Sequence, residues 1–268
     1  MSVLVNGRPG NTLDALDRGL QYGDGLFETI AIRAGRPRLL RHHLERLADG
    51  CRRLLMDAPD SELLEREIAA VARVPAAVVK VIVTRGVGGR GYRPPGGLQA
   101  TRIVASFPWP DRSGGQSAGG IRLRTCTTRL SSNPRLAGIK HLGRLEQVLA
   151  RAEWRDDSIA EGLMLDEAGH VVCGTQSNLF ALMAGELVTP RVDRCGVAGV
   201  MRRAVLEWAS GQGVTARELD LRPEELPGAA EIFVTNAIVG AWPARELDGR
   251  ALPRGTMAAE FNRWLEHE

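Results

Sequence analysis

The sequence contains almost no lysine. Of its 35 basic residues only Lys80 and Lys140 are lysines, and the other 33 are arginines. Arginine therefore supplies nearly all of the positive charge. An arginine stays protonated in proteins, whereas a lysine amine can lose its proton and act as a base or a nucleophile. Lysine is also the residue that forms Schiff bases with carbonyl compounds. The two lysines are therefore the first candidates for a reactive group.

Other features are also scarce, and each absence disfavours a class of protein. The four cysteines lie far apart without a CxxC pair, which argues against a zinc site and a disulfide framework. Aromatic residues make up only 4% of the chain, and like charges form no runs, so nucleic-acid binding is disfavoured. No apolar run is long enough to cross a bilayer, and the first residues do not resemble a signal peptide. We expect a cytoplasmic protein with no metal, nucleic-acid or membrane partner.

The length and composition are those of a globular protein with a sizeable core. The chain has 268 residues, of which 44% are apolar and 25% charged. This length permits two subdomains. We predict an α+β (α/β) fold with mixed sheets flanked by helices. The smaller N-terminal subdomain would span residues 1–110, a linker residues 111–120, and the larger C-terminal subdomain residues 121–268.

Lys140 lies in a segment whose surroundings favour a functional role. Pro134 and Gly138 mark a turn before it. Residues 121–126 alternate between apolar and polar, as in a half-buried strand, and leucines recur at helical spacing after the lysine. Lys140 is thus predicted at a junction between strand and helix, where a rigid scaffold can present a side chain into a cleft. The local alternative is a solvated lysine near a helix start.

Lys80 is the competing candidate for the reactive amine. It interrupts residues 78–84, a nearly continuous apolar run that predicts a strand buried on both faces. A lysine there must reach solvent, a partner or a cleft. The following loop, residues 85–92, is rich in glycine but too irregular for a dinucleotide-binding fingerprint. It carries two arginines and Tyr92, as a flexible anion-binding lid would.

A second glycine-rich segment suggests an anion site. Residues 196–199 are predicted to open a helix that continues to Ser210. Backbone N–H groups at such a helix start bind phosphate well. A plain helix start made of small residues is an equally good local interpretation.

Three separated segments together resemble the fold type IV pyridoxal-phosphate enzymes. This family includes branched-chain aminotransferases, D-amino acid aminotransferases and aminodeoxychorismate lyases. The segments are Arg18–Gly25, Thr84–Tyr92 and Asn133–Leu149, and they are most similar to those of the 4-amino-4-deoxychorismate lyases. The resemblance runs nearly end to end. It implies a homodimer that converts 4-amino-4-deoxychorismate into 4-aminobenzoate and pyruvate in folate biosynthesis.

The resemblance also implies roles for individual residues. Lys140 would form the Schiff base with pyridoxal phosphate and act as the catalytic base, with Tyr92 as a second catalytic group. The remaining predicted contacts are Arg46, the backbone of Val197 and Ala198, and Thr235 or Asn236 at the phosphate, Cys173 at the ring, and Thr29, Arg90 and Tyr92 near the substrate. The role of Lys80 stays open, and no metal is expected.

One residue departs from the family pattern. The family usually has a glutamate at the position of Cys173, where it pairs with the protonated pyridine nitrogen of the cofactor. Such a carboxylate makes the ring a strong electron sink, and a thiol is a much poorer partner. We therefore expect a pyridine nitrogen that is protonated less readily, unless Glu161 reaches it. Transamination would suffer more than the lyase reaction, because aromatisation of the product drives pyruvate loss.

Two other functions remain open at this stage. A branched-chain or D-amino acid aminotransferase would use the same fold, and the fold alone does not decide between them. A protein that binds pyridoxal phosphate without catalysis is the second alternative, and the missing glutamate would favour it.

Overall fold

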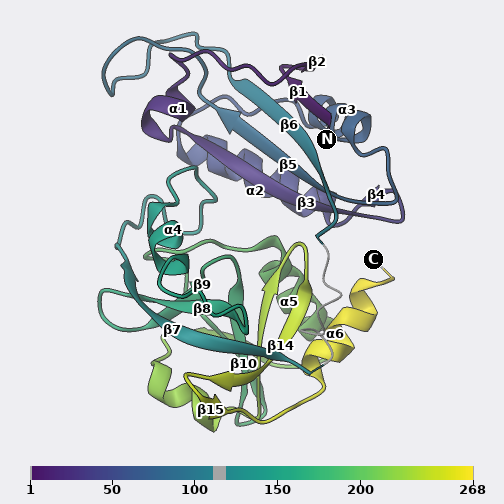
Figure 1. Cartoon of the computed structure of the whole chain (residues 1–268), viewed down its shortest axis with the longest axis vertical. Helices are drawn as coiled ribbons and strands as arrows, with labels where there is room; N and C mark the ends of the chain where they lie inside the picture. The colour runs from purple at the N-terminus through teal and green to yellow at the C-terminus, as the bar shows by residue number, and fades with distance from the viewer. Residues whose placement is uncertain (1, 111–118, 268) are drawn as a thin grey trace. The chain divides into compact units, whose positions relative to one another are not determined.

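The computed structural model describes residues 2–110 and 119–267, and its contacts divide them into two compact units. Unit 1 contains the described residues up to 110 together with residues 139–143, and unit 2 contains the remainder. The return of residues 139–143 to unit 1 was not part of the predicted subdomain boundaries. Most of the predicted linker, residues 111–118, lies outside the described residues. Both units combine helices with sheets, which confirms the predicted α+β class (Figure 1).

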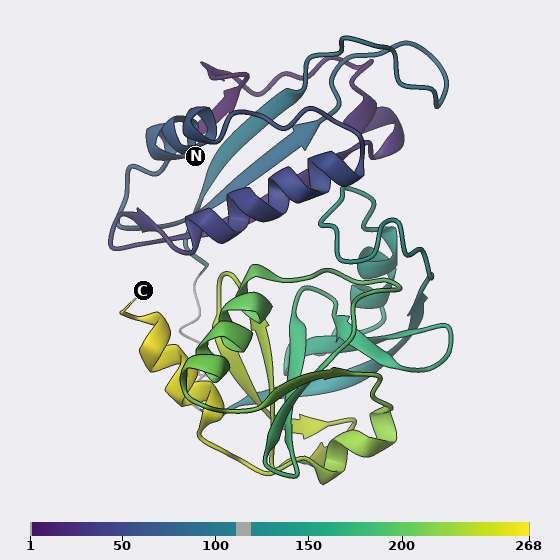
Figure 2. The same ribbon diagram turned by 180° about the vertical axis from the view of Figure 1, so that it is seen from behind.

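Unit 1 is built on an antiparallel sheet of six strands, in the order β2-β1-β6-β5-β3-β4. Its elements are β1 (Ser2–Val5), β2 (Arg8–Pro9), α1 (Arg18–Tyr22), β3 (Gly25–Arg33), β4 (Arg36–Pro37), α2 (Leu40–Arg53), α3 (Ser61–Val71), β5 (Ala76–Thr84) and β6 (Thr101–Pro108). Figures 1 and 2 show α2 and α3 on the same face of this sheet.

The sheet of unit 1 has one buried face and one half-buried face. On β3, Leu26 and Ile30 belong to the core beneath α2 and α3, whereas Phe27 and Thr29 are half-buried on the other face. Burial also alternates along β5, where Lys80 occupies the half-buried face. The prediction that this strand is buried on both faces was therefore wrong. The apolar residues of the half-buried face hid the alternation in the sequence.

Residues 139–143 extend the sheet at the outer edge of β3. The Phe27 N–H donates to the Lys140 carbonyl oxygen at 3.0 Å, and the Leu142 N–H donates to the Gly25 carbonyl oxygen at 3.0 Å. Ile139 is buried in the core beneath the helices. Because successive side chains of an extended segment point to opposite faces, Lys140 projects on the half-buried face.

Unit 2 is built on a mixed sheet in the order β12-β11-β10-β13-β14-β7-β8-β9, with β15 paired to β14. The pairs β11–β12, β14–β7 and β7–β8 are parallel. Its elements are β7 (Ile121–Leu130), α4 (Leu145–Arg151), β8 (Ile159–Asp166), β9 (Val171–Gly174), β10 (Asn178–Met183), β11 (Glu186–Pro190), α5 (Val200–Gly211), β12 (Ala216–Leu219), the 3-10 helix η1 (Pro223–Gly228), β13 (Glu231–Asn236), β14 (Gly240–Leu247), β15 (Arg250–Ala251) and α6 (Met257–Leu265).

The helices of unit 2 differ from the sequence prediction in two places. α4 is only two turns long, and α5 begins at Val200 instead of Gly196. α5 and α6 pack together through Trp208 and Phe261, whose ring centroids are 5.6 Å apart. β14 was not predicted, because Pro243 and the charged residues after it obscure the strand period. None of the described helices has the length and apolar character needed to span a membrane.

Candidate active site

Both lysines of the chain lie against one aromatic ring in unit 1. The Lys140 Nζ is 4.2 Å from the ring centroid of Phe27, and the Lys80 Nζ is 5.2 Å from the same centroid. A cation at this distance is attracted to an aromatic face. Thr29 pairs with Lys80 in the strand register and follows Phe27 on the same face. The predicted nucleophile, its competitor and one predicted substrate residue are thus gathered around Phe27.

Arg46 is held by Glu28, a buried carboxylate on the helix-facing side of β3, and the charge of Lys140 still acts on the neighbouring His43. Arg46 donates from Nε to the Glu28 Oε1 at 2.8 Å and from Nη2 to the Glu28 Oε2 at 2.5 Å. The His43 Nδ1 lies 2.5 Å from the same Oε2. His43 and Arg46 are three residues apart on α2 and therefore share one helix face. The predicted phosphate ligand is thus part of a three-residue cluster.

The electrostatics of this cluster keep Glu28 charged and His43 neutral. Burial alone would raise the pKa of Glu28, but the Arg46 charge and the hydrogen bonds from His43 and Arg46 lower that pKa to about 2. Burial lowers the pKa of His43, and Glu28 only partly offsets this effect. The ring therefore donates through Nδ1 to Glu28. Its buried Nε2 has no hydrogen-bond partner among the described residues.

The loop that carries Arg90 and Tyr92 is anchored through its backbone. Arg18 is buried and donates to the carbonyl oxygens of Gly91 at 2.9 Å and Tyr92 at 3.1 Å. The Tyr22 hydroxyl accepts from the Gly91 N–H at 3.2 Å. The Tyr92 ring packs edge-on against Tyr22, yet Tyr92 is 85% exposed. The expected lid is therefore pinned at its base, and its predicted substrate residues project outward.

In unit 2, Asn178 fixes the start of α5. Its Nδ2 donates to the Val197 carbonyl oxygen at 2.9 Å, and its Oδ1 accepts from the Gly199 N–H at 3.1 Å. A Cβ atom on Gly199 would lie only 2.1 Å from this Oδ1. Glycine is therefore required at the N-cap for Asn178 to hold the helix start.

The hydrogen bonds at this helix start bear on the phosphate contacts predicted for the backbone of Val197 and Ala198. The Ala198 N–H donates to the Gly138 carbonyl oxygen at 3.0 Å, so it is committed within the chain. The first intrahelical bond runs from the Arg203 N–H to the Gly199 carbonyl oxygen. The N–H groups of residues 200–202 therefore have no acceptor inside the helix. Small residues at 196–199 suggested a helix, but they form the connection before it.

Thr235 and Asn236 end β13 beside this helix start. Thr235 pairs with Asn178 in the strand register. Its side chain is buried, and its Oγ1 has no hydrogen-bond partner among the described residues. The Asn236 Oδ1 accepts from the N–H groups of Ile238 at 2.9 Å and Val239 at 3.0 Å. A buried hydroxyl without a described partner and helix N–H groups without an acceptor inside the helix are both groups that can bind a phosphate.

Cys173 lies near the connection that precedes α5. Its Sγ is 3.8 Å from the position that a Cβ on Gly196 would take. Burial, with smaller contributions from Cys195 and Glu161, raises the pKa of the Cys173 thiol to about 12, although Arg144 opposes the shift. The thiol therefore stays neutral at physiological pH and brings no negative charge to this site.

Glu161 does not replace the missing carboxylate, because the turn between β9 and β10 occupies it. Its side chain is buried. Its two oxygens accept from Gly162 N at 2.9 Å, Thr175 N at 3.0 Å, Thr175 Oγ1 at 2.5 Å, Gln176 N at 3.3 Å and Ser177 Oγ at 2.8 Å. Both oxygens of the Glu161 carboxylate are thus occupied by hydrogen bonds, most of them from this turn.

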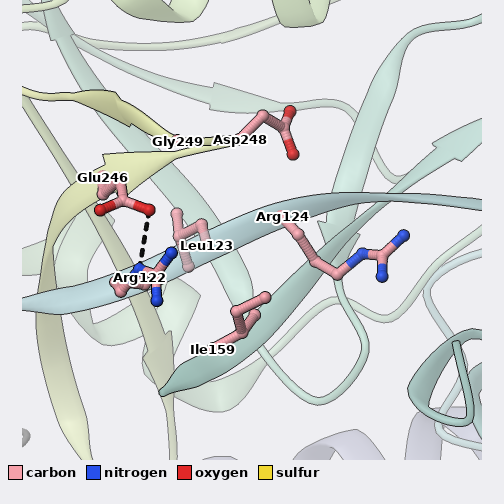
Figure 3. Close-up of a pocket in the computed structure, with 7 residues that line it drawn as sticks. All are labelled: Arg122, Leu123, Arg124, Ile159, Glu246, Asp248 and Gly249. Carbon is pink, nitrogen blue, oxygen red and sulfur yellow. Dashed lines mark hydrogen bonds and ion pairs between the residues drawn. The ribbon is translucent and has the colours of Figure 1, made fainter. Parts of the chain in front are cut away.

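A separate cavity in unit 2 contains none of the predicted site residues. It has a volume of about 220 Å³ and lies between β7, β8 and the β14–β15 turn (Figure 3). Its Arg122 Nε donates to Glu246 at 2.7 Å, and Asp248 accepts from Thr125 N and Oγ1 at 2.7 Å each. Arg122, Glu246 and Asp248, which line this cavity, are therefore already bound to other residues of the chain. The described residues also contain no group of three or more metal-ligating side chains.

Comparison with known proteins identifies the family. Residues 25–247 match the model of the family described as Amino-transferase class IV. The chain belongs to this family. The family is pyridoxal-phosphate-dependent, and its fold type IV architecture confirms the predicted fold and resemblance.

Individual relatives include a lyase and aminotransferases. The chain is 35% identical over 240 residues to the aminodeoxychorismate lyase of Vibrio harveyi, covering 89% of each chain. It is similar to the crystal structure of 4-amino-4-deoxychorismate lyase from Pseudomonas aeruginosa, with a TM-score of 0.94 and 49% identity over 99% of this chain and 98% of that one. The branched-chain-amino-acid aminotransferase of Escherichia coli is 28% identical over 251 residues, which cover 90% of this chain and 81% of that protein.

Each unit offers groups that fit parts of pyridoxal phosphate. Unit 1 provides the Lys140 amine and the oriented guanidinium of Arg46, and unit 2 provides the α5 amides and the orphaned Thr235 hydroxyl. The sequence prediction overlooked Glu28 and His43. A signal for Glu28 existed, since it replaces an apolar residue in the buried series of β3 and therefore needs a partner.

The Glu28 cluster predicts how stability changes with pH. The folded-state pKa of Glu28 is lowered, so its stabilising effect is present above about 4.5 and is lost as the pH falls towards about 2. Glu28→Gln should therefore lower the free energy of unfolding at neutral pH, by on the order of 3 kcal/mol. The difference in the free energy of unfolding between the variant and the unaltered chain should become smaller as Glu28 is protonated in acid. Urea denaturation across this range measures it, and a pH-independent difference would contradict this assignment.

Proposed function

We propose that this chain is a pyridoxal-phosphate-dependent lyase that converts 4-amino-4-deoxychorismate into 4-aminobenzoate and pyruvate. The principal support is its 49% identity to the Pseudomonas aeruginosa lyase over nearly the whole of both chains. The half-buried placement of Lys140 beside Phe27 is consistent with this role. The reaction belongs to folate biosynthesis, which leads us to propose a cytoplasmic location.

Each unit, taken by itself, carries residues that we propose as cofactor contacts. Lys140 would hold the cofactor covalently, and Arg46 would bind its phosphate. Within unit 2, the proposed phosphate contacts are the N–H groups of residues 200–202, the Thr235 hydroxyl and the Asn236 side chain. When bound, pyridoxal phosphate supplies an electron sink for negative charge at the carbon that carries the substrate nitrogen.

Lys140 is the proposed acid–base group. Its amine, once free, removes the proton from the ring carbon that bears the substrate nitrogen. The bond between the ring and the ether oxygen then breaks, and the three-carbon fragment leaves as pyruvate after it takes up a proton. Lys140 or the Tyr92 hydroxyl donates that proton. Aromatisation of the remaining ring makes the step strongly favourable.

Lys80 receives a proposed role that the sequence left open. The substrate carries two carboxylates, and Lys80 places a second cation on the Phe27 ring that Lys140 also contacts. We assign Lys80 to one carboxylate, with Thr29 beside it in the sheet. Arg90 is the proposed partner of the other carboxylate, because a planar guanidinium suits a carboxylate.

An aminotransferase is the alternative that the comparisons also support, since the Escherichia coli branched-chain enzyme matches most of the chain at 28% identity. A D-amino acid aminotransferase would be a related variant. The neutral Cys173 thiol argues against efficient transamination, which depends more strongly on a cationic ring. A protein that binds the cofactor without catalysis is the third candidate, and any turnover of an amine substrate would exclude it.

The lysine assignment can be tested by substitution. Lys140→Ala should abolish both 4-aminobenzoate formation and the visible absorbance of the covalently bound cofactor. Lys80→Ala should keep the absorbance and raise KM by about tenfold or more, because it removes only a carboxylate contact. Absorption spectra and steady-state kinetics of both variants measure this. Loss of the absorbance in Lys80→Ala instead of Lys140→Ala would reverse the assignment.

The Cys173 assignment predicts a spectroscopic shift. Cys173→Glu would place a carboxylate at the pyridine nitrogen and raise the pKa of that nitrogen, since an opposite charge favours the protonated form. The pH dependence of the cofactor absorbance should therefore move upward by about one unit or more. Cys173→Ser serves as the uncharged control and should leave it unchanged. An unchanged titration in Cys173→Glu would show that this residue does not face the ring.

We also propose that the chain forms a homodimer through α4. Leu145, Val148 and Leu149 are 76%, 61% and 61% exposed on this short helix, although all three are apolar. Exposed apolar patches of this kind often mark interfaces. A second copy of the chain is the proposed occupant.

Sedimentation tests this dimer. Val148→Glu should shift the mass towards the monomer, because it places a charge in the proposed apolar interface. Val74→Glu, at an exposed apolar position of unit 1, is the matched control and should sediment like the unaltered chain. A monomeric unaltered chain, or an undisturbed dimer in Val148→Glu, would contradict the proposed interface.

A further inference from the structure

Glu28 is the one charged residue in the helix-facing series of β3. Its neighbours in that series, Leu26, Ile30 and Ile32, are buried and apolar. A buried carboxylate is costly unless hydrogen bonds and an opposite charge compensate it. Here Arg46 and His43 provide that compensation. The arrangement therefore ties a residue at the proposed cofactor site to a carboxylate in the core.

The contacts to Glu28 determine how the Arg46 guanidinium is oriented. Both carboxylate oxygens bind one edge of it, through Nε and Nη2, at 2.8 and 2.5 Å. A bidentate pair of this kind restricts the planar group to one orientation. The edge that contains Nη1 is thereby directed away from Glu28. The Arg46 side chain is 15% exposed, so part of it reaches the protein surface.

His43 in turn restrains Glu28. Its Nδ1 lies 2.5 Å from the Glu28 Oε2, which also accepts from Arg46. The neutral ring can only donate through Nδ1 if Nε2 stays unprotonated, and this Nε2 is buried without a partner among the described residues. A buried polar atom without a partner is unfavourable. The His43 bond to Glu28 is nevertheless present, and it restrains the carboxylate that binds Arg46.

We propose that Glu28, restrained by His43, is a positioning residue that directs the Arg46 guanidinium towards the phosphate of the cofactor. This inference rests on the proposed function, because it requires Arg46 to bind that phosphate. Glu28 does not touch the cofactor in this scheme. Glu28 acts only through the residue that binds the phosphate. Its substitution should therefore leave the affinity for a ligand without a phosphate unchanged.

Glu28 could affect phosphate affinity in two opposite ways, and the direction of the change distinguishes them. The Glu28 anion also repels a phosphate through space, and its removal would tighten phosphate binding if repulsion were dominant. In Glu28→Gln the amide NH2 faces one of the Arg46 N–H donors, so the two-point contact is lost and the long side chain regains its rotamer freedom. Positioning therefore predicts weaker binding, and repulsion predicts tighter binding.

The experiment compares two ligands on the full chain. Dissociation constants for pyridoxal phosphate and for pyridoxal, which lacks the phosphate, are measured by absorbance titration after removal of any bound cofactor. Glu28→Gln should weaken pyridoxal phosphate binding by about tenfold, which corresponds to about 1.4 kcal/mol. Pyridoxal binding should change by less than about twofold. Glu67→Gln is the matched control, because Glu67 forms a similar buried pair with Arg102 in unit 1.

A second pair of variants covers the case in which Glu28→Gln does not fold. His43→Leu removes the donor to Glu28 and should show the same phosphate-selective loss. His43→Asn retains an N–H donor near the Nδ1 position and should restore most of the affinity. Equal loss of both ligands, no loss, or tighter binding of pyridoxal phosphate would overturn the proposal. Failure of the unaltered chain to bind pyridoxal phosphate would instead contradict the proposed function itself.

Discussion

The pairing of residues 139–143 with the edge of β3 is the interaction on which the proposed site depends. These residues leave unit 2 in the sequence, join the sheet of unit 1 and then return. Two backbone hydrogen bonds and the buried Ile139 hold them there. The strand alternation then places Lys140 on the half-buried face beside Phe27. This short extended segment therefore fixes the position of the Lys140 amine.

The two units carry different kinds of groups. Unit 1 offers charged side chains, whose orientation depends on buried pairs such as Glu28 with Arg46. Unit 2 offers mainly backbone amides and a hydroxyl, which depend on Asn178 and Gly199 at the start of α5. Cys173 leaves unit 2 without a carboxylate at the predicted ring contact, since its thiol is neutral and Glu161 is occupied by a turn. This electrostatic difference favours chemistry that depends little on a cationic ring.

The sequence predicted the strands at residues 78–84 and 121–126 and singled out Lys140 as a candidate, because apolar patterns and residue rarity are local properties. It misplaced the start of α5, because small residues at 196–199 suit either a helix or an extended connection until the bond from Ala198 to Gly138 is seen. It also missed the role of Glu28, whose partners lie on a different element. The burial of β5 was misjudged because Lys80 shares its face with apolar residues. Contacts between elements distant in sequence decide each of these points.

Measuring pyruvate and 4-aminobenzoate in parallel tests whether this chain is the proposed lyase. The purified chain, loaded with pyridoxal phosphate, is mixed with 4-amino-4-deoxychorismate, and both products are followed over time. We predict that the two products appear in equal amounts and that neither forms with Lys140→Ala. Conversion of the cofactor to its amine form by ordinary amino acids, without pyruvate release from 4-amino-4-deoxychorismate, would contradict the account and identify an aminotransferase.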